Sequence, residues 1–149
     1  KIIIDILDEF EKEMKYRPFQ DAIEFVDILN ANNIPACIVT SSSMLKMNNA
    51  FEQLPGFKEK FNGLVTGDMV KNCKPDPEGY LLGSEMIGIK PENCIVFEDS
   101  LQGIQAGLNA GSKVVALTTT VSRDKIEKLK ANKIIDNFAG LEIDDIIAL

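Results

Sequence analysis

Apolar residues recur along the chain in two patterns, which predict two kinds of element. Where they return at steps of three and four, the pattern predicts an amphipathic helix, and short continuous apolar runs predict strands buried on both faces. Because helices and strands alternate, the sequence predicts an α/β fold with a parallel sheet and helices on both faces. The predicted helices cover residues 1–14, 19–30, 44–54, 78–87, 100–110, 123–130 and 141–149. The predicted strands cover residues 34–39, 64–65, 94–97, 114–117 and 134–135.

Composition narrows the class of protein. A length of 149 residues fits one domain, and 45% hydrophobic with 26% charged residues is ordinary for a globular protein. No apolar run approaches the roughly 20 residues that a membrane helix needs, so no membrane partner is expected. The net charge of −7 and the lack of a basic stripe argue against a nucleic-acid partner.

The cysteines and the missing histidine restrict the chemistry further. Cys37, Cys73 and Cys94 show no CxxC spacing, and two of them, Cys37 and Cys94, lie in apolar runs as small core residues. A reducing cytoplasm is the simplest setting for such a chain. Since the chain has no histidine, Ser-His-Asp and Cys-His triads and His-ligated zinc are excluded.

Candidate functional residues follow the predicted strands. Ligands of open parallel sheets bind beyond the carboxyl ends of the strands. Thr40 and the backbone N–H groups of Ser41 and Ser42, helped by the start of the next helix, are predicted to bind phosphate oxygens. Lys74, on a loop, can bridge an incoming phosphate and a carboxylate nucleophile. Glu98 and Asp99 offer hard oxygens to Mg²⁺.

Each of these residues also has an ordinary structural explanation. Thr40 alone would usually be a capping residue, and Lys74 before a proline would usually be a solvated turn residue. Glu98 and Asp99 could simply begin a helix, where carboxylates suit the positive end of the helix dipole. Only their order and their shared position at strand ends favour a functional site.

Four stretches resemble the later signature motifs of the haloacid dehalogenase superfamily. They are IPACIVTSSS, CKPDPEGYLLGSEMIGI, PENCIVFEDSLQGIQAGLNAG and SKVVALTT, and the resemblance runs from about Tyr16 to the C-terminus. The closest subgroup is that of β-phosphoglucomutases and small sugar-phosphate phosphatases. The resemblance implies a Rossmann-like core that transfers phosphoryl groups with Mg²⁺ through an aspartyl-phosphate, hydrolysing a small sugar-phosphate metabolite.

The resemblance also implies individual roles. Thr40 fills the second motif, binds the transferring phosphoryl group and is, with Lys74 of the third motif, a catalytic residue. Glu98 and Asp99 fill the fourth motif as metal ligands, with Asp99 the stronger candidate for direct contact with Mg²⁺. The small residues after this motif are expected to allow close packing of a helix on the sheet. They are Gly103, Ala106, Gly107, Ala110 and Gly111.

The chain departs from the family in its first motif. The DxDGT or DxDST sequence, which carries the nucleophile and the general acid/base, is absent from these 149 residues. The run Ile2-Ile3-Ile4-Asp5 is rejected as a substitute, because position 7 is Leu7, no Gly-Thr follows and a helical period continues.

The domain organisation is interpreted accordingly. Residues 1–15 are predicted to be the last helix of a cap domain, and residues 16–149 a catalytic core that lacks its central first strand. The chain is therefore expected to be N-terminally truncated, to need a missing N-terminal segment of the same protein as its partner, and to be inactive alone.

Three other functions stay open at this point. A β-phosphoglucomutase is less favoured than a phosphatase, because Ser43 and Met44 stand where such mutases carry Lys-Asn-like residues. A signalling receiver domain requires its acidic pair before Thr and Lys, whereas here Thr40 and Lys74 come first. A non-catalytic remnant is compatible with the missing nucleophile.

Overall fold

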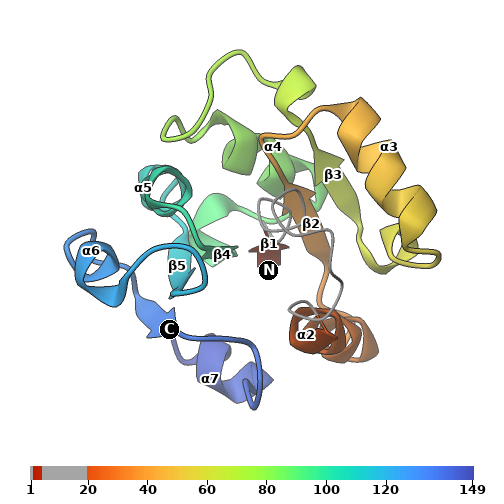
Figure 1. Ribbon diagram of the computed structural model, residues 1–149. Helices are drawn as coiled ribbons and strands as arrows, with labels where there is room; N and C mark the ends of the chain where they lie inside the picture. The colour runs from red at the N-terminus through yellow and green to blue at the C-terminus, as the bar shows by residue number, and fades with distance from the viewer. Residues whose placement is uncertain (1, 5–19) are drawn as a thin grey trace.

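The computed structural model describes residues 2–4 and 20–149 and shows one twisted sheet between helices (Figure 1). All paired strands run parallel, and their order across the sheet is β3-β2-β1-β4-β5-β6. Helices cover both faces of such a parallel sheet, so its short strands are apolar on both sides. The strands are β1 (Ile2–Ile4), β2 (Ala36–Val39), β3 (Gly63–Val65), β4 (Ile95–Glu98), β5 (Lys113–Leu117) and β6 (Lys133–Ile135).

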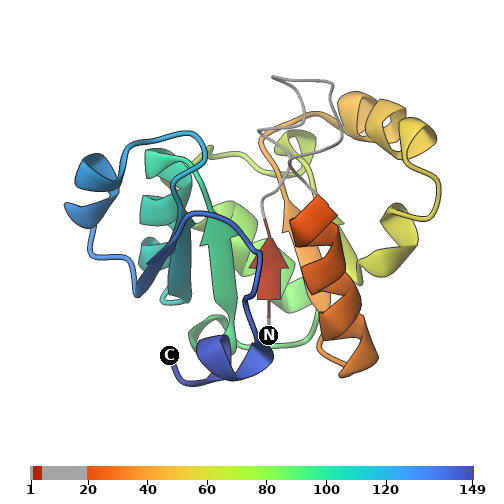
Figure 2. The same cartoon turned by 60° about the horizontal axis from the view of Figure 1, so that its bottom comes forward.

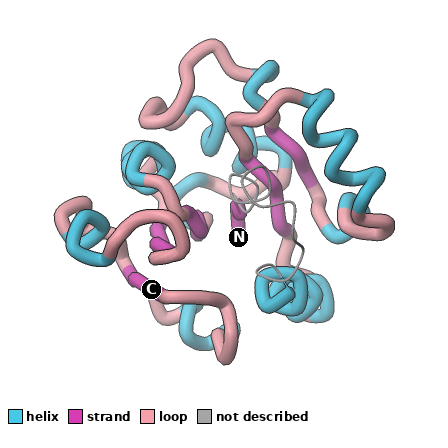
Figure 3. The backbone as a smooth tube through the Cα atoms, in the orientation of Figure 1, coloured by secondary structure: helices cyan, strands magenta, loops and turns pink. Residues whose placement is uncertain are grey.

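The helices lie on the two sides of the sheet (Figure 3). The α-helices are α2 (Gln20–Ala31), α3 (Met44–Gln53), α4 (Glu78–Met86), α5 (Leu101–Asn109), α6 (Arg123–Glu127) and α7 (Ile143–Ile147). Three short 3₁₀ helices interrupt the loops. They are η1 (Lys58–Lys60), η2 (Gly67–Met69) and η3 (Pro91–Asn93).

Each face of the sheet buries its own hydrophobic cluster. On one face α2 and α7 pack against β4 and β5, with Phe25 of α2 in contact with Phe97. On the other face α4, α5 and α6 pack against the alternate strand residues, which include Val96 and Val114. Neighbouring residues of a strand point to opposite faces, so Val96 and Phe97 belong to different clusters. α3 packs at the β2–β3 side through Met47.

The order of elements predicted from the sequence is confirmed over residues 20–149. The predicted parallel α/β sheet and nearly all predicted boundaries agree with the structure, and differences amount to a few residues. α6 is shorter than predicted, since it ends at Glu127, before Lys130 adopts a left-handed backbone conformation with φ of 61°. In α2, Phe25 rather than Ile28 faces the core, and Ile28 is 42% exposed.

The first strand corrects two expectations. Ile2–Ile4 were predicted to begin a helix, and the central strand between the strands ending at Thr40 and Glu98 was predicted to be missing from the chain. Instead β1 pairs with both β2 and β4, and Ile3 lies opposite Cys37 on one side and Val96 on the other. Three β-branched residues favour a strand, and their pairing satisfies the backbone groups of two buried neighbours. The remainder of the predicted cap helix, residues 5–15, lies outside the described residues.

Small residues let α5 approach the sheet closely, as predicted. A Cβ atom added at Gly107 would lie 2.8 Å from Cγ2 of Val114 and 3.2 Å from Cγ1 of Val96. Gly111, with φ of 83°, supplies the left-handed conformation just after the helix. Cys37 and Cys94 are buried as predicted. Among the described residues, no helix combines the length and hydrophobicity required to span a bilayer.

Candidate functional site

The predicted site residues lie at the carboxyl edge of the sheet, and the strands run toward the upper side of the sheet in Figure 2. Thr40 comes directly after β2 and Asp99 directly after β4, while Glu98 is the last residue of β4. Because β1 lies between β2 and β4, the loops that follow these two strands flank the end of the central strand. Lys74 reaches the same edge from the loop between η2 and α4.

The loop after β2 is tightly held by its own hydrogen bonds. Thr40 is buried, and its hydroxyl oxygen accepts a hydrogen bond from the backbone N–H of Ser42 at 3.1 Å. Ser43 caps α3 by accepting from the N–H of Lys46, and Oδ2 of Asp68 accepts from the N–H of Met44 at 2.7 Å. The N–H groups of Met44 and Lys46 therefore already have acceptors within the protein, although the start of this helix was expected to help bind phosphate.

Lys74 is a buried cation, not a solvated turn residue. Its side chain is 10% exposed, and its ammonium group lies 3.0 Å from Oε2 of Glu98. The same group donates to the carbonyl oxygen of Val39, at 3.4 Å, and lies 5.0 Å from the ring centroid of Tyr80. Contacts to the end of β2 and the end of β4 thus fix one positive charge between the two strands.

Glu98 is the residue that holds this arrangement together. Its Oε2 atom accepts hydrogen bonds from Lys74 and, at 2.6 Å, from the hydroxyl of Tyr80. Its Oε1 atom accepts from the N–H groups of Asp99 and Ser100 and from the hydroxyl of Ser100, all at 3.0 Å. Both carboxylate oxygens are therefore saturated by protein donors.

The charge state of Glu98 follows from these contacts. Complete burial by itself would raise the pKa of Glu98. The nearby Lys74 ammonium and the hydrogen bonds from Tyr80 and Ser100 outweigh burial and lower the pKa to about 2. Glu98 is consequently a stable buried carboxylate that compensates the charge of Lys74.

Gly103 makes room for the Glu98 side chain. A Cβ atom added at Gly103 would lie 1.9 Å from Oε2 and 2.0 Å from Cδ of Glu98. The first turn of α5 therefore passes directly over the carboxylate, and Ser100 connects the two by accepting from the N–H of Gly103 at 3.0 Å. The expected packing role of this glycine thus includes a buried ion pair as well as the sheet.

Asp99 occupies a different environment from its neighbour Glu98. It is 5% exposed, and its Oδ2 atom accepts a hydrogen bond from the hydroxyl of Thr120 at 2.6 Å. The hydroxyl of Thr119 lies 3.5 Å from the same oxygen. These threonines follow β5, the neighbour of β4, so the loop after the next strand contributes to holding Asp99.

A cavity of about 240 Å³ opens beside Thr40 and Lys74, whereas Glu98 and Asp99 do not line it. Thr40, Ser41 and Lys74 line it together, which brings three of the predicted phosphate-binding residues to one space. Asp68 and Cys73 also contribute to its wall. Its mixture of hydroxyl, ammonium and backbone groups suits a small anion.

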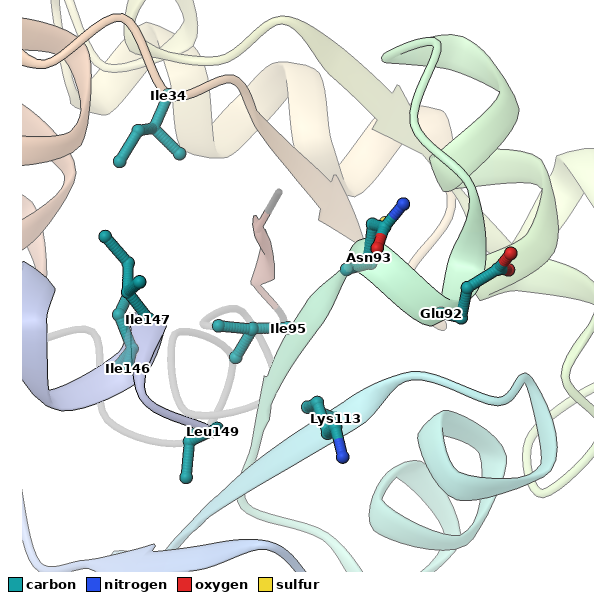
Figure 4. A pocket seen from close by; sticks show the side chains of 9 residues that line it. Ile34, Glu92, Asn93, Ile95, Lys113, Ile146, Ile147 and Leu149 are labelled. Atoms are coloured by element: carbon teal, nitrogen blue, oxygen red, sulfur yellow. The ribbon is translucent and has the colours of Figure 1, made fainter.

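A larger cavity of about 400 Å³ lies at the opposite, amino edge of the sheet (Figure 4). It is bounded mainly by apolar side chains from three separate segments, with Glu92, Asn93 and Lys113 at its border. No predicted site residue lines it. The apolar residues are Ile34, Ile95, Ile146, Ile147 and Leu149.

The carboxylates at the site can be compared with the ligands that Mg²⁺ requires. Within residues 2–4 and 20–149 no group of three Asp, Glu, Cys or His side chains could hold a metal ion. Mg²⁺ is usually held by only one or two carboxylates together with water and substrate phosphate, so Asp99 fits as one ligand. Glu98 fits less well, because Lys74 and the other donors already engage both of its oxygens.

Sequence reasoning missed three contributors to the site. Tyr80 and Gly103 contact Glu98, and Thr120 contacts Asp99. Thr120 could have been found, because it follows a parallel strand just as Thr40 does, and the same strand-end rule applies to it. Tyr80 had no comparable signal, since its position on α4 resembles an ordinary buried aromatic.

Comparison with known proteins agrees with this geometry. A family model described as haloacid dehalogenase-like hydrolase matches residues 1–111. Hexitol phosphatase A of Escherichia coli is 36% identical over 110 residues, covering 72% of this chain and 49% of that protein. The phosphorylated carbohydrates phosphatase of Thermotoga maritima is 34% identical over 119 residues, covering 73% of this chain and 55% of that protein. The chain therefore spans about half the length of these relatives.

Solved structures show the same architecture. A haloacid dehalogenase hydrolase of Entamoeba histolytica superimposes with a TM-score of 0.76 at 28% identity, covering 87% of this chain and 59% of that one. A β-phosphoglucomutase of Clostridium difficile gives a TM-score of 0.73 at 26% identity, covering 84% and 52%. Since the family model matches residues 1–111 of the 149, the chain belongs to the haloacid dehalogenase-like hydrolases.

Proposed function

We propose that this chain forms the phosphate-binding core of an Mg²⁺-dependent phosphatase that hydrolyses a small phosphorylated sugar through an aspartyl-phosphate. The observation that carries the proposal is the buried Lys74–Glu98 pair, which fixes one ammonium group at the cavity of about 240 Å³ that Thr40 also lines. The relatives named as phosphatases of hexitols and phosphorylated carbohydrates support the choice of substrate class.

Each residue has a defined task in this proposal. The Thr40 hydroxyl and the loop that follows it bind oxygens of the phosphoryl group, and Lys74 compensates its negative charge during transfer. Glu98 orients Lys74 and compensates its charge, which makes Glu98 a positioning residue and not a metal ligand. Asp99 would hold Mg²⁺, which supplies further charge compensation when bound.

We assign no residue of this chain as the nucleophile. β1 occupies the central place of the sheet. Asp5 follows Ile4 in the sequence and is therefore an alternative candidate for the nucleophile. We keep the proposal that it is not the nucleophile, since Leu7 replaces the second aspartate and no Gly-Thr follows. Without the acid/base carboxylate, the 149-residue chain alone is expected to show no steady turnover.

Turnover of p-nitrophenyl phosphate tests the proposal. The natural protein should require Mg²⁺, and Asp99→Ala should abolish turnover, whereas Asp5→Asn should leave it unchanged. Loss of activity in Asp5→Asn would identify Asp5 as the nucleophile and contradict our assignment. Full activity of Asp99→Ala, or activity that is indifferent to Mg²⁺, would refute the metal-dependent mechanism.

A mutase remains the second candidate. The structural similarity to a β-phosphoglucomutase favours it, because the core superimposes over most of the chain. A hexose 1-phosphate substrate separates the two functions: a phosphatase releases inorganic phosphate, whereas a mutase produces the 6-phosphate isomer. Accumulation of the isomer without phosphate release would decide for the mutase.

A further inference from the structure

Three consecutive threonines after β5 contact two different carboxylates, those of Asp99 and Asp136. Thr120 donates a hydrogen bond to Oδ2 of Asp99 at 2.6 Å. Thr118 donates to Oδ1 of Asp136, also at 2.6 Å, just beyond the end of β6. The loop therefore connects the end of β4 with the end of β6, and it does so because β5 lies between these two strands.

We infer that Thr120 is a positioning residue, which fixes the Asp99 carboxylate in the orientation that binds the divalent cation. The inference rests on the proposed function, in which Asp99 is a metal ligand. A hydroxyl-to-carboxylate hydrogen bond of this length is a strong one, since the acceptor is charged and nearly buried. It restricts rotation of the carboxylate by holding one of its two oxygens.

The loop is itself anchored, so Thr120 is not simply one mobile residue that meets Asp99. Thr118 and Arg123 both bind Asp136, with the Arg123 guanidinium 3.0 Å from the carboxylate oxygen. These contacts hold the loop at both of its ends, before Thr119 and after Thr120. Thr120 thus contacts Asp99 from a loop that is itself held at the ends of β5 and β6.

Thr119 is a weaker candidate for the same task. Its hydroxyl lies 3.5 Å from Oδ2 of Asp99, which is long for a hydrogen bond between two oxygens. Thr118 provides a matched control, because it has the same side chain in the same loop but contacts Asp136. Partners that orient metal ligands typically change metal affinity by roughly 10- to 100-fold when removed, so the effect is measurable.

Binding of Mn²⁺ tests the inference without any need for turnover. Mn²⁺ accepts the same hard oxygen ligands as Mg²⁺ and is followed by electron paramagnetic resonance. Thr120→Val, which keeps the shape but removes the hydroxyl, should weaken Mn²⁺ binding roughly tenfold. Thr120→Ser retains the hydroxyl and should bind within about threefold of the wild type. Thr118→Val leaves the Arg123–Asp136 ion pair to anchor the loop and should bind as the wild type does, and thermal melting reports whether each variant is folded.

The outcomes separate the inference from the proposal on which it rests. If the wild-type chain bound no Mn²⁺, both the metal-dependent function and the role of Thr120 would be overturned. If the wild type bound Mn²⁺ and Thr120→Val bound it equally well, only the role of Thr120 would fail. Equal losses in Thr118→Val and Thr120→Val would show an effect of loop stability, and would also overturn the inference.

Discussion

The carboxyl and amino edges of the sheet bury different kinds of side chain. At the carboxyl edge a cavity of about 240 Å³ lies beside a buried ion pair and several hydroxyl groups. At the amino edge a cavity of about 400 Å³ is surrounded by isoleucine and leucine side chains (Figure 4). The larger cavity therefore has no convergent set of polar groups, whereas the smaller one does. Chemistry, not volume, distinguishes the candidate site.

The two edges also affect stability in different ways. Burying a charge pair costs desolvation energy, and Lys74 and Glu98 recover it only through their complete set of partners. Burying isoleucine at the amino edge stabilises the fold directly by removing apolar surface from water. A change at the carboxyl edge should therefore affect both folding and ligand binding, whereas a change at the amino edge should affect folding alone.

Glu98→Gln should produce the largest effect. The substitution keeps the shape but leaves the Lys74 ammonium buried without its counter-charge, which costs about 3–5 kcal/mol of unfolding free energy. Urea unfolding measures this difference. Glu92→Gln, at the border of the amino-edge cavity, is the matched control and should stay within about 0.5 kcal/mol of the wild type. A Glu98→Gln variant as stable as this control would contradict the role given to the ion pair.

The same pair predicts a pH dependence with a definite sign. The pKa of Glu98 in the folded protein is lowered to about 2 from an ordinary value of 4.5. Its contribution to stability is therefore fully present above about pH 4.5 and is lost as the pH falls toward 2. The stability difference between the wild type and Glu98→Gln should be constant above this window and shrink within it. A difference that grew on acidification would contradict the lowered pKa.

Ile146→Ala should give a somewhat smaller loss, confined to folding. Ile146 is 1% exposed beside the amino-edge cavity, and its truncation should cost about 3 kcal/mol. Mn²⁺ affinity should not change, because the residue lies at the opposite edge from Asp99. The adjacent Ile147, 62% exposed, gives the control Ile147→Ala, which should alter stability by less than about 0.5 kcal/mol. Weaker Mn²⁺ binding in Ile146→Ala would show that the two edges are coupled.

Much of the fold could be predicted from the sequence because the spacing of the apolar residues agrees with the polar residues that end each helix or strand. The run ending at Thr40 and the run ending at Glu98 are apolar and short, and both are buried strands in the structure. Their parallel arrangement then places Thr40 and Asp99 at one edge, as the sequence predicted. The exposed position of Ile28 shows the limit of this approach, since an apolar residue within a helix need not face the core.

Other features depend on tertiary contacts that no local pattern contains. The saturation of Glu98 by Lys74 and Tyr80 arises from three segments that meet only after folding. Ile2–Ile4 show the same limitation, because their helical period competes with pairing to both β2 and β4. Backbone pairing on both edges of a central strand outweighs a local helical preference.

Alkylation of the cysteines should distinguish the two edges of the sheet with the smallest change to the protein. Cys73 is exposed at the wall of the carboxyl-edge cavity, whereas Cys94 is buried beside the amino-edge cavity. Burial raises the pKa of Cys94, and burial and then the nearby Cys94 raise the pKa of Cys37 to about 12. Since the thiolate is the reactive form, iodoacetamide at about pH 7.5 should modify the native protein only at Cys73.

Mass spectrometry of the intact chain and of its peptides measures this modification. One adduct is expected on the native protein, none on Cys73→Ser, and adducts on all three cysteines of the wild type after unfolding in urea. The unfolded sample shows that Cys37 and Cys94 are reactive once exposed, so their protection in the native state reports burial. Modification of Cys94 in the native protein would mean that the amino edge opens to solvent, and the contrast between the two edges would then be one of chemistry but not of accessibility.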